Sequence, residues 1–284
     1  MNKAVNYSRR NKINKLFKHP LQAINKYMQL RLVNKFHKIK IIKGKLFFGQ
    51  QMFLVIPEPV SVYLSGYGYF EEGLSNFILE YLNEGQVFID IGSHFGYYTL
   101  LGSQIVGEKG EVHAFEPTPS TYEILKKNYK HCNMFINNLA LSDKNQIKDF
   151  YDAGLKFSAF NSFYRPYLND LKSHKENILL KKIQVKCTTL DEYFKGKERL
   201  PDFVKIDAEG AELQIFGGMN QIIKKKHPII TLEVGDHQGF KDNLSSQKVK
   251  YLINLGYQAF EYSNGEICRH VIKEKYGYSN LLFV

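Results

Sequence analysis

The 284-residue sequence predicts a doubly wound α/β fold, a mostly parallel, Rossmann-like sheet of seven strands preceded by a basic helical extension. Two observations predict this fold. From residue 86 onward, short apolar runs alternate with helical periods, a pattern typical of strands buried between two layers of helices. A glycine turn also follows the first of these runs, in VFIDIGSHFGYYTL at 87–100. Such a turn is expected where a buried strand leads into a helix whose N-terminus faces a ligand.

The basic extension covers residues 1–45, which hold thirteen Lys and Arg and no Asp or Glu. The net charge of +11 therefore belongs to this extension, and the rest of the chain is close to neutral. From Pro20 an apolar period predicts an amphipathic helix, whereas residues 1–19 predict a poorly ordered arm. Two alternatives stay open for the helix. It packs on the core with its lysines in water, or it docks on an anionic membrane, a partner or a nucleic acid.

Residues 46–85 predict a lead-in to the main domain, which we place at 86–284. The stretch LFFGQQMFLVIPEPVSVYL at 46–64 predicts a hairpin bounded by Pro57 and Pro59. The stretch FEEGLSNFILEYL at 70–82 predicts a helix that leads into the first core strand.

The elements of the main domain alternate along the chain. We predict strands at 86–91, 111–116, 134–139, 147–151, 183–188, 202–207, 228–234, 257–262 and 280–284. We predict helices near 97–106, 119–130, 189–194, 210–225 and 244–255. The polar segment 152–182 predicts a lid or substrate loop inserted between strands.

Cysteine usage and hydropathy narrow the cellular setting. Cys132, Cys187 and Cys268 are scattered and form no CxxC pair, so the sequence predicts neither a disulfide framework nor a zinc site. No apolar run reaches the ~20 residues that span a bilayer, and no apolar signal-peptide segment follows the basic start. We therefore expect a cytoplasmic protein, with the inner membrane surface as a second location if the basic helix docks there. Nothing in the sequence indicates the oligomeric state.

The glycine turn narrows the choice of ligand. In DIGSHFG, Asp90 ends a strand, Gly92 and Gly96 flank the turn, and His94 stands where a dinucleotide-binding G-x-G-x-x-G motif has its second glycine. A carboxylate before the turn would repel a pyrophosphate and attract a cationic amine. S-adenosylmethionine carries an α-amino group and a sulfonium, so the charge pattern favours it over a dinucleotide.

Further cofactor contacts are predicted at the ends of neighbouring elements. Glu116 ends the next strand, in VHAFEP at 112–117, where a carboxylate can accept hydrogen bonds from both ribose hydroxyls. The third strand ends in NNLALSD, and we expect Asn138, Ser142 and Asp143 to line the adenine. For Asp143 a plain turn role stays open. We also place Glu72, in the helix at 70–82, among the cofactor contacts.

A second cluster, DFVKIDAEGAELQIFGGM at 202–219, delivers charges to a strand end, where open α/β sheets bind ligands. Alternation puts Lys205, Asp207 and Glu209 on one side of the chain, and such crowded charges are costly to bury unless they pair or do chemistry. The next strand, PIITLEV, delivers Glu233 and then His237. We treat these five as candidate catalytic residues. A plain Lys205–Asp207 ion pair and a structural role for Glu233 stay open.

Six segments in order and spacing resemble the FkbM-type S-adenosylmethionine-dependent methyltransferases, namely VFIDIGSHFGYYTL, VHAFEP, NNLALSD, TTLDEYF, DFVKIDAEGAE and HPIITLE. The resemblance covers residues 70–284 and implies a class I methyltransferase fold and a methyltransferase activity (EC 2.1.1). It implies cofactor contacts and an active-site block at Asp90, Gly92, Gly96, Glu116, Lys205, Asp207, Glu209, Gly210 and Glu212. The basic extension and the 152–182 insertion depart from the pattern of the family.

By this resemblance the acceptor is a hydroxyl on a sugar of a surface glycan or on a polyketide. The Asn-, Tyr- and Phe-rich insertion suits a carbohydrate, so we expect O-methylation in glycan biosynthesis. An alcohol has to lose a proton, and we expect Asp207 or Glu209 to be the general base, with Lys205 orienting it and His237 ranked lower. The carboxylates show no convincing metal-ligand spacing, so we expect no metal.

Two other function classes are weighed against this reading. A nucleic-acid methyltransferase is the leading alternative because of the basic arm, but the strand ends in KIDAEG rather than an Asn-Pro-Pro-aromatic segment. A dehydrogenase or non-catalytic binding module of Rossmann type is the third class, and the carboxylate of Asp90 disfavours it. We expect a small-molecule or glycan acceptor as the partner rather than a nucleic acid.

Overall fold

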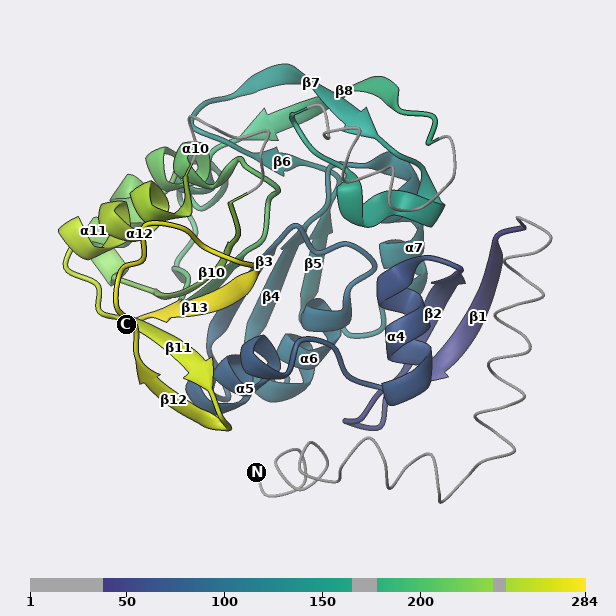
Figure 1. Ribbon diagram of the computed structural model, residues 1–284, viewed down its shortest axis with the longest axis horizontal. Helices are drawn as coiled ribbons and strands as arrows, with labels where there is room; N and C mark the ends of the chain where they lie inside the picture. The colour runs from purple at the N-terminus through teal and green to yellow at the C-terminus, as the bar shows by residue number, and fades with distance from the viewer. Residues whose placement is uncertain (1–37, 165–177, 237–243) are drawn as a thin grey trace.

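A computed structural model describes residues 38–164, 178–236 and 244–284 (Figure 1). Its described part contains an eight-stranded sheet with the order β12-β11-β13-β10-β9-β3-β4-β5. The five strands from β10 to β5 run parallel, while β13, β11 and β12 continue the sheet in antiparallel pairs. The bounds are β3 (Val87–Ile91), β4 (Glu111–Phe115), β5 (Met134–Asn137), β9 (Phe203–Ile206), β10 (Ile229–Val234), β11 (Ala259–Ser263), β12 (Glu266–Arg269) and β13 (Ser279–Phe283). The predicted doubly wound, mostly parallel fold is confirmed, and β12 is a strand beyond the seven expected.

Helices cover both faces of this sheet, and alternate strand residues face each layer. Val87 and Ile89 of β3 pack in one core cluster, and Phe88 between them packs in the other. The first cluster also takes in side chains of α9 (Leu190–Tyr193), α10 (Glu212–Gly217), α11 (Asn220–Lys226) and α12 (Ser245–Asn254). The second takes in α4 (Pro59–Tyr67), α5 (Glu72–Tyr81), α6 (Tyr97–Val106) and α7 (Pro119–Asn128) (Figure 1). Strands buried on both faces explain why the sequence shows continuous apolar runs there.

The lead-in differs from the expectation. The hairpin consists of β1 (Lys40–Lys45) and β2 (Gln51–Ile56), so the predicted position at 46–64 is wrong. Residues 59–67 form α4 instead. Pro59 stands in its first turn, and the Glu58 carboxylate caps it by accepting hydrogen bonds from the backbone N–H groups of Val60 and Ser61. The two prolines therefore mark a helix start rather than a strand end.

The segment between the third and fourth parallel strands folds into a second sheet above the main one (Figure 1). It has the order β6-β8-β7, with β6 (Ala140–Leu141), β7 (Gln146–Asp152) and β8 (Lys181–Thr188), and a 3-10 helix, η1 (Leu155–Phe160), follows β7. Residues 165–177 of the predicted insertion lie outside the described residues, as do the predicted arm and the whole of the predicted amphipathic helix.

One predicted helix, 210–225, is broken into α10 and α11. The break has a packing cause, since a Cβ at Gly218 would lie 2.0 Å from the carbonyl oxygen of Ser142. In the described part of the chain, no helix has the length and apolar character that crossing a membrane requires.

Candidate active site

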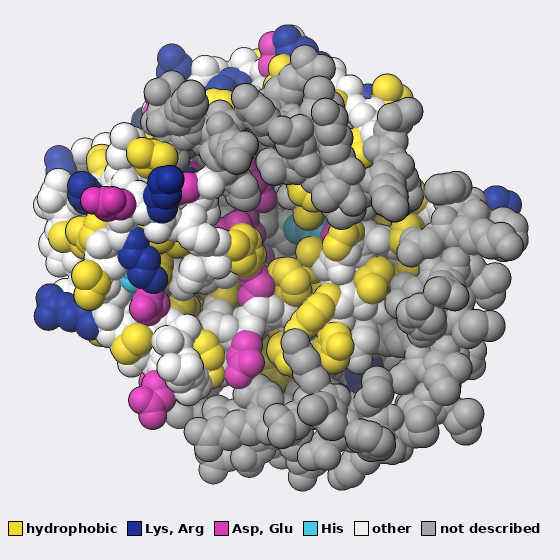
Figure 2. All heavy atoms as spheres, viewed as in Figure 1, with side chains coloured by type: hydrophobic (Ala, Val, Ile, Leu, Met, Phe, Trp, Pro, Cys, Tyr) yellow, Lys and Arg dark blue, Asp and Glu magenta, His cyan; other side chains and the backbone are white. Residues whose placement is uncertain are grey.

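A cavity opens over the carboxyl ends of β3, β4, β9 and β10, where open α/β sheets bind ligands. Its lining combines the turn after β3, the ends of the neighbouring strands, the lead-in segment and η1. Figure 2 shows acidic side chains gathered in the hollow at the centre of this face, with hydrophobic side chains beside them. The cavity is thus an acidic site with an apolar wall.

The turn after β3 brings backbone close to this cavity. Gly92 has φ +70, and a Cβ there would lie 1.8 Å from the carbonyl oxygen of Asp207, so glycine is required. His94 also has a positive φ, of 52°. Its ring packs on Phe95, and its Nε2 lies 2.7 Å from the hydroxyl of Ser158. Burial lowers the pKa of His94 to about 3, so this imidazole is neutral in the cavity wall.

Glu116, just past β4, faces the same cavity. One of its carboxylate oxygens accepts the backbone N–H of His94 at 3.1 Å, and the other accepts that of Thr118 at 2.9 Å. The side chain of Thr118 adds a hydrogen bond to this carboxylate, whose remaining lone-pair capacity faces the cavity. Burial raises the pKa of Glu116 to about 7, above its ordinary value of 4.5. This geometry suits a pair of ribose hydroxyls donating to a fixed carboxylate.

Asp90 was predicted to contact the cofactor, but the structure buries it completely and leaves it out of the cavity lining. Its Oδ2 accepts the hydroxyl of Thr99 at 2.6 Å, and its Oδ1 lies 3.2 Å from the ammonium of Lys205. Both of its oxygens are engaged inside the protein, and Asp90 is not among the residues that line the cavity. It instead holds Lys205.

Lys205 joins the cofactor turn to the second cluster. Its ammonium lies 3.2 Å from Asp90 and 3.4 Å from Asp207, and it donates to the carbonyls of Ile91 and Gly92. Burial opposes its charge, but the carboxylates of Asp90 and then Asp207 outweigh burial and hold the pKa of Lys205 above its ordinary value. This lysine is therefore a fixed cation that ties the ends of β3 and β9 together.

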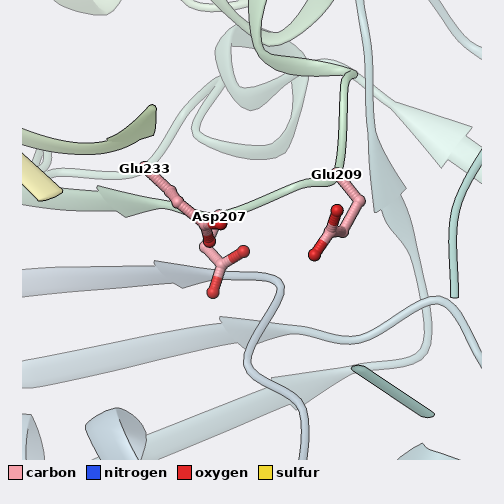
Figure 3. Close-up of side chains that lie close together, drawn as sticks. All are labelled: Asp207, Glu209 and Glu233. Atoms are coloured by element: carbon pink, nitrogen blue, oxygen red, sulfur yellow. The ribbon is translucent and has the colours of Figure 1, made fainter. Parts of the chain in front are cut away.

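Three carboxylates converge beside Lys205, from Asp207, Glu209 and Glu233 (Figure 3). Their ligand atoms all lie within 4.8 Å of one another. Burial, and then the charges of Asp207 and Glu212, raises the pKa of Glu209 to about 8. Burial, Asp207 and Glu209 raise the pKa of Glu233 well above its ordinary value, and Glu233 shares a hydrogen bond with Asp207. Protons shared within the cluster or a divalent cation would each relieve this repulsion.

The turn that carries Glu209 is held in place by a buried ion pair between Glu212 and Lys248. Glu209 and Gly210 have φ values of 45° and 95°. Glu212 accepts the backbone N–H of Gly210 at 3.0 Å, and its other oxygen lies 2.8 Å from Lys248 of α12. Glu212 and Lys248 are both buried and do not line the cavity. Their pair positions the turn rather than contacting a ligand.

Other predicted residues lie at the margin or outside the cavity. Asn138 donates to the backbone carbonyls of Glu116 and Pro117, and the buried Ser142 bonds to Asp143 and Gln214. The predicted contacts absent from the lining are Glu72, Asp90, Gly96, Asn138, Ser142 and Asp143, whereas Gly92, His94, Glu116, Lys205, Asp207, Glu209 and Glu233 line it. His237 lies outside the described residues.

The cavity also contains side chains that sequence reasoning missed, notably Glu71, Tyr98 and Tyr278. Glu71 accepts hydrogen bonds from the hydroxyls of Tyr98 and Tyr278 and from the amide of Asn280. Its neighbour Glu72 is exposed at the start of α5 and contacts Tyr262. The sequence offers two adjacent glutamates and no signal to tell them apart, because the partners that hold Glu71 inward, Tyr278 and Asn280, lie 207 and 209 positions further along the chain.

A model of one protein family matches most of the chain. The Methyltransferase FkbM domain matches residues 90–278, about two thirds of the length. A search among curated proteins found no match.

Solved structures give more distant matches. A methyltransferase FkbM from Methylobacillus flagellatus KT is similar at 15% identity with a TM-score of 0.43, over 70% of this chain and 43% of that chain, so this chain spans less than half of that protein. Fibrillarin from Aeropyrum pernix, solved with natively bound S-adenosyl-L-methionine, matches at 10% identity with a TM-score of 0.43, over 87% of this chain and 100% of that chain. A SAM-dependent O-methyltransferase from Thermotoga maritima matches at 11% identity with a TM-score of 0.40, over 86% of this chain and 77% of that chain. The assignment of the chain to a family rests on the domain match alone.

Proposed function

The chain belongs to the FkbM family of S-adenosylmethionine-dependent methyltransferases, and from this premise we propose that it methylates a hydroxyl group of a sugar. Family membership confirms the methyltransferase class and the cofactor expected from the sequence. The identity of the acceptor is the proposal, and the charge of the cavity is the observation that carries it.

The residues of the turn after β3 and the end of β4 fit this cofactor. Glu116 would accept the ribose hydroxyls with the lone pairs that His94 and Thr118 leave open. Gly92 lines the cavity, and it lets the turn pack against the carbonyl of Asp207, where no side chain fits. When bound, the cofactor would supply a methyl group that is carried on a sulfonium. The sulfonium sulfur becomes a neutral thioether once the methyl group has been transferred. The acidic lining favours the cationic cofactor over its neutral product.

The acceptor end of the cavity favours a ligand that donates hydrogen bonds and carries no phosphate. Asp207, Glu209 and Glu233 offer carboxyl groups to it, and carboxylates accept hydrogen bonds from hydroxyl groups. Among the described residues that line the cavity, Lys205 is the one basic side chain besides the neutral His94. Its charge is already balanced by Asp90 and Asp207. A phosphate group would meet net repulsion here, whereas a sugar would not.

Methyl transfer to an alcohol requires a base, and Glu209 suits this role better than Asp207. The Asp207 carboxylate is already engaged, by Lys205 at 3.4 Å and by a hydrogen bond shared with Glu233. The raised pKa of Glu209 makes it a stronger base near neutral pH. As the acceptor oxygen forms its bond to the methyl carbon and the carbon–sulfur bond breaks, the hydroxyl proton passes to Glu209. Asp207 and Lys205 fix the acceptor and the turn.

Methyl transfer from labelled S-adenosylmethionine tests the proposal. Cell-derived glycans, free sugars, nucleotide sugars and total RNA are incubated in parallel with the enzyme and with Glu209→Gln. Label in the glycan or free-sugar fraction that disappears with Glu209→Gln supports the proposal. Label in RNA alone would contradict it and favour the nucleic-acid alternative, in which the thirteen basic side chains of residues 1–45 bind phosphates.

The same basic charge supports a second partner. We propose that residues 1–45 bring the enzyme to an anionic membrane surface, because each Lys or Arg near such a surface contributes about 1 kcal/mol. Flotation of the full chain with vesicles of neutral and of 30–40% anionic lipid (roughly a physiological to strongly charged surface) tests this. Equal binding to both vesicles would contradict it.

A further inference from the structure

The cofactor carries an α-carboxylate and an α-ammonium that no residue described so far binds. Its methionyl portion carries an α-ammonium, which needs an acceptor, and an anionic one is the strongest. Asp90 was the sequence candidate, yet its oxygens are taken by Thr99 and Lys205 and none of it lines the cavity. The acceptor must be sought among the carboxylates that do line the cavity.

Glu71 is a carboxylate that three side chains hold in that lining. It precedes α5 with a left-handed φ of 42°, a conformation that a non-glycine residue adopts only when its surroundings impose it. Tyr98 donates to its Oε2 at 2.8 Å, while Tyr278 and the amide of Asn280 donate to its Oε1. A carboxylate offers about four lone-pair positions, so one position, on Oε2, remains for a ligand.

The position of Glu71 fits the far end of a cofactor whose ribose lies on Glu116. In the sheet, β4 lies on one side of β3, and β9, β10 and β13 follow on the other side. Glu116 follows β4, whereas Glu71 contacts Asn280 of β13 and Tyr98 of α6. Lys205 lines the same cavity, and its charge acts on both Glu71 and Glu116. A ligand that reaches from Glu116 across the Gly92 turn therefore points its tail toward Glu71.

The other carboxylates at that end cluster together, beside Lys205 and the second sheet. Asp207 is bound to Lys205 and to Glu233, and Glu209 sits on the turn next to the second sheet, where the hydroxyl of Ser162 donates to its carbonyl. We infer that Glu71 binds the α-ammonium of the cofactor through the free lone pair of Oε2, and that Tyr98, Tyr278 and Asn280 orient it for this contact. The inference rests on the proposed function only in assuming S-adenosylmethionine as the cofactor, and it does not depend on the identity of the acceptor.

Two product-like ligands separate this role from a structural one. S-adenosylhomocysteine carries the ammonium, whereas 5′-methylthioadenosine keeps the adenosine and sulfur but lacks the amino acid. Calorimetry measures both affinities for the full chain and for Glu71→Gln. We expect Glu71→Gln to lower the affinity for S-adenosylhomocysteine by roughly 10- to 100-fold, as for loss of a hydrogen bond between charged groups. The affinity for methylthioadenosine should stay within about twofold of the wild-type value. Glu80→Gln, an exposed change on the same helix, should alter neither affinity.

Each contrary outcome has a distinct meaning. Equal weakening of both ligands by Glu71→Gln, or no weakening of either, overturns the inference. If Glu71→Gln does not fold, the wild-type protein and an S-adenosylhomocysteine analogue that lacks the amino group replace the variant, and an unchanged affinity for the analogue overturns the inference. Failure of the wild-type protein to bind S-adenosylhomocysteine at all would instead refute the proposed function.

Discussion

The ammonium of Lys205 lies 3.2 Å from Oδ1 of Asp90, and the two side chains are only 2% and 0% exposed. This buried pair joins β3 to β9 directly beneath the turn that we propose to bind the cofactor. A second carboxylate, Asp207, lies 3.4 Å from the same ammonium at the cavity wall. The charge that anchors the fold therefore also sets the electrostatics of the acceptor end.

Lys205→Met should destabilise the protein strongly. It leaves the buried carboxylate of Asp90 without its cation, and breaking a buried ion pair in this way costs about 3–5 kcal/mol. Urea unfolding at pH 7 measures the loss. Lys126→Met is the control, because Lys126 pairs with Glu123 at 2.8 Å but the two side chains are 48% and 60% exposed, and such exposed pairs contribute little to stability. Equal losses of unfolding free energy in the two variants would show that the buried pair stabilises the protein no more than the exposed pair does.

Glu209→Gln should lose turnover and keep cofactor binding. Glutamine preserves the shape of the side chain but cannot take the acceptor proton, and removal of a general base costs about 10²–10⁴-fold in kcat. Transfer assays on the acceptor fraction, with calorimetry of S-adenosylhomocysteine, separate the two effects. Glu192→Gln, an exposed change on α9, serves as the control. A Glu209→Gln enzyme with turnover close to wild type would remove Glu209 from the mechanism and return the role to Asp207.

The ligand-free protein should become less stable as the pH rises from about 5 to 8. Burial raises the pKa of Glu116 to about 7, and burial with neighbouring carboxylates raises that of Glu209 to about 8, against 4.5 without the fold. The folded protein therefore holds more protons than the unfolded chain in this window. Their stabilising contribution is complete below pH 4.5 and is lost as the pH passes the folded values.

Melting temperatures of the ligand-free protein across this range check the slope. Glu116→Gln and Glu209→Gln should each flatten it, whereas the exposed Glu80→Gln should not. A slope that all three variants share with the wild type would mean that other groups cause it.

The sequence predicted the sheet well because its strands are buried on both faces, which leaves unbroken apolar runs such as that of β3. It also predicted which strand ends carry charge, and the structure brings Glu116, Lys205, Asp207, Glu209 and Glu233 to one cavity. These are properties of local pattern and of parallel strands whose carboxyl ends share one edge.

What the sequence could not predict depends on distant partners. Whether Asp90 faces a ligand or the interior is decided by Lys205, 115 positions further along the chain. The choice between Glu71 and Glu72 is decided by Tyr278 and Asn280, which belong to the last strand and the loop before it. No periodicity within a helix or strand contains that information.

Gly92→Ala should destabilise the protein far more than Gly85→Ala. Both glycines have a positive φ, of 70° and 80°, so a Cβ strains the backbone by about 1 kcal/mol at either site. At Gly92 the Cβ would also lie 1.8 Å from the carbonyl oxygen of Asp207, whereas at Gly85 it meets nothing within 4 Å. The difference in unfolding free energy therefore isolates the clash, and we expect it to be about 1–3 kcal/mol. Equal unfolding free energies would mean that β3 and β9 separate enough to admit a methyl group.

Cofactor binding should release protons near neutral pH. With a pKa of about 7, Glu116 is half protonated in the free protein at that pH, and ribose hydroxyls that donate to it favour its ionised form. Binding of S-adenosylhomocysteine at pH 7 should therefore release about half a proton. Calorimetry in two buffers with different ionisation enthalpies measures this release from the difference in observed heat. Glu116→Gln should abolish the difference, because glutamine cannot ionise. If the difference persisted in this variant, the proton would come from another group, and Glu209 would be the next one to replace.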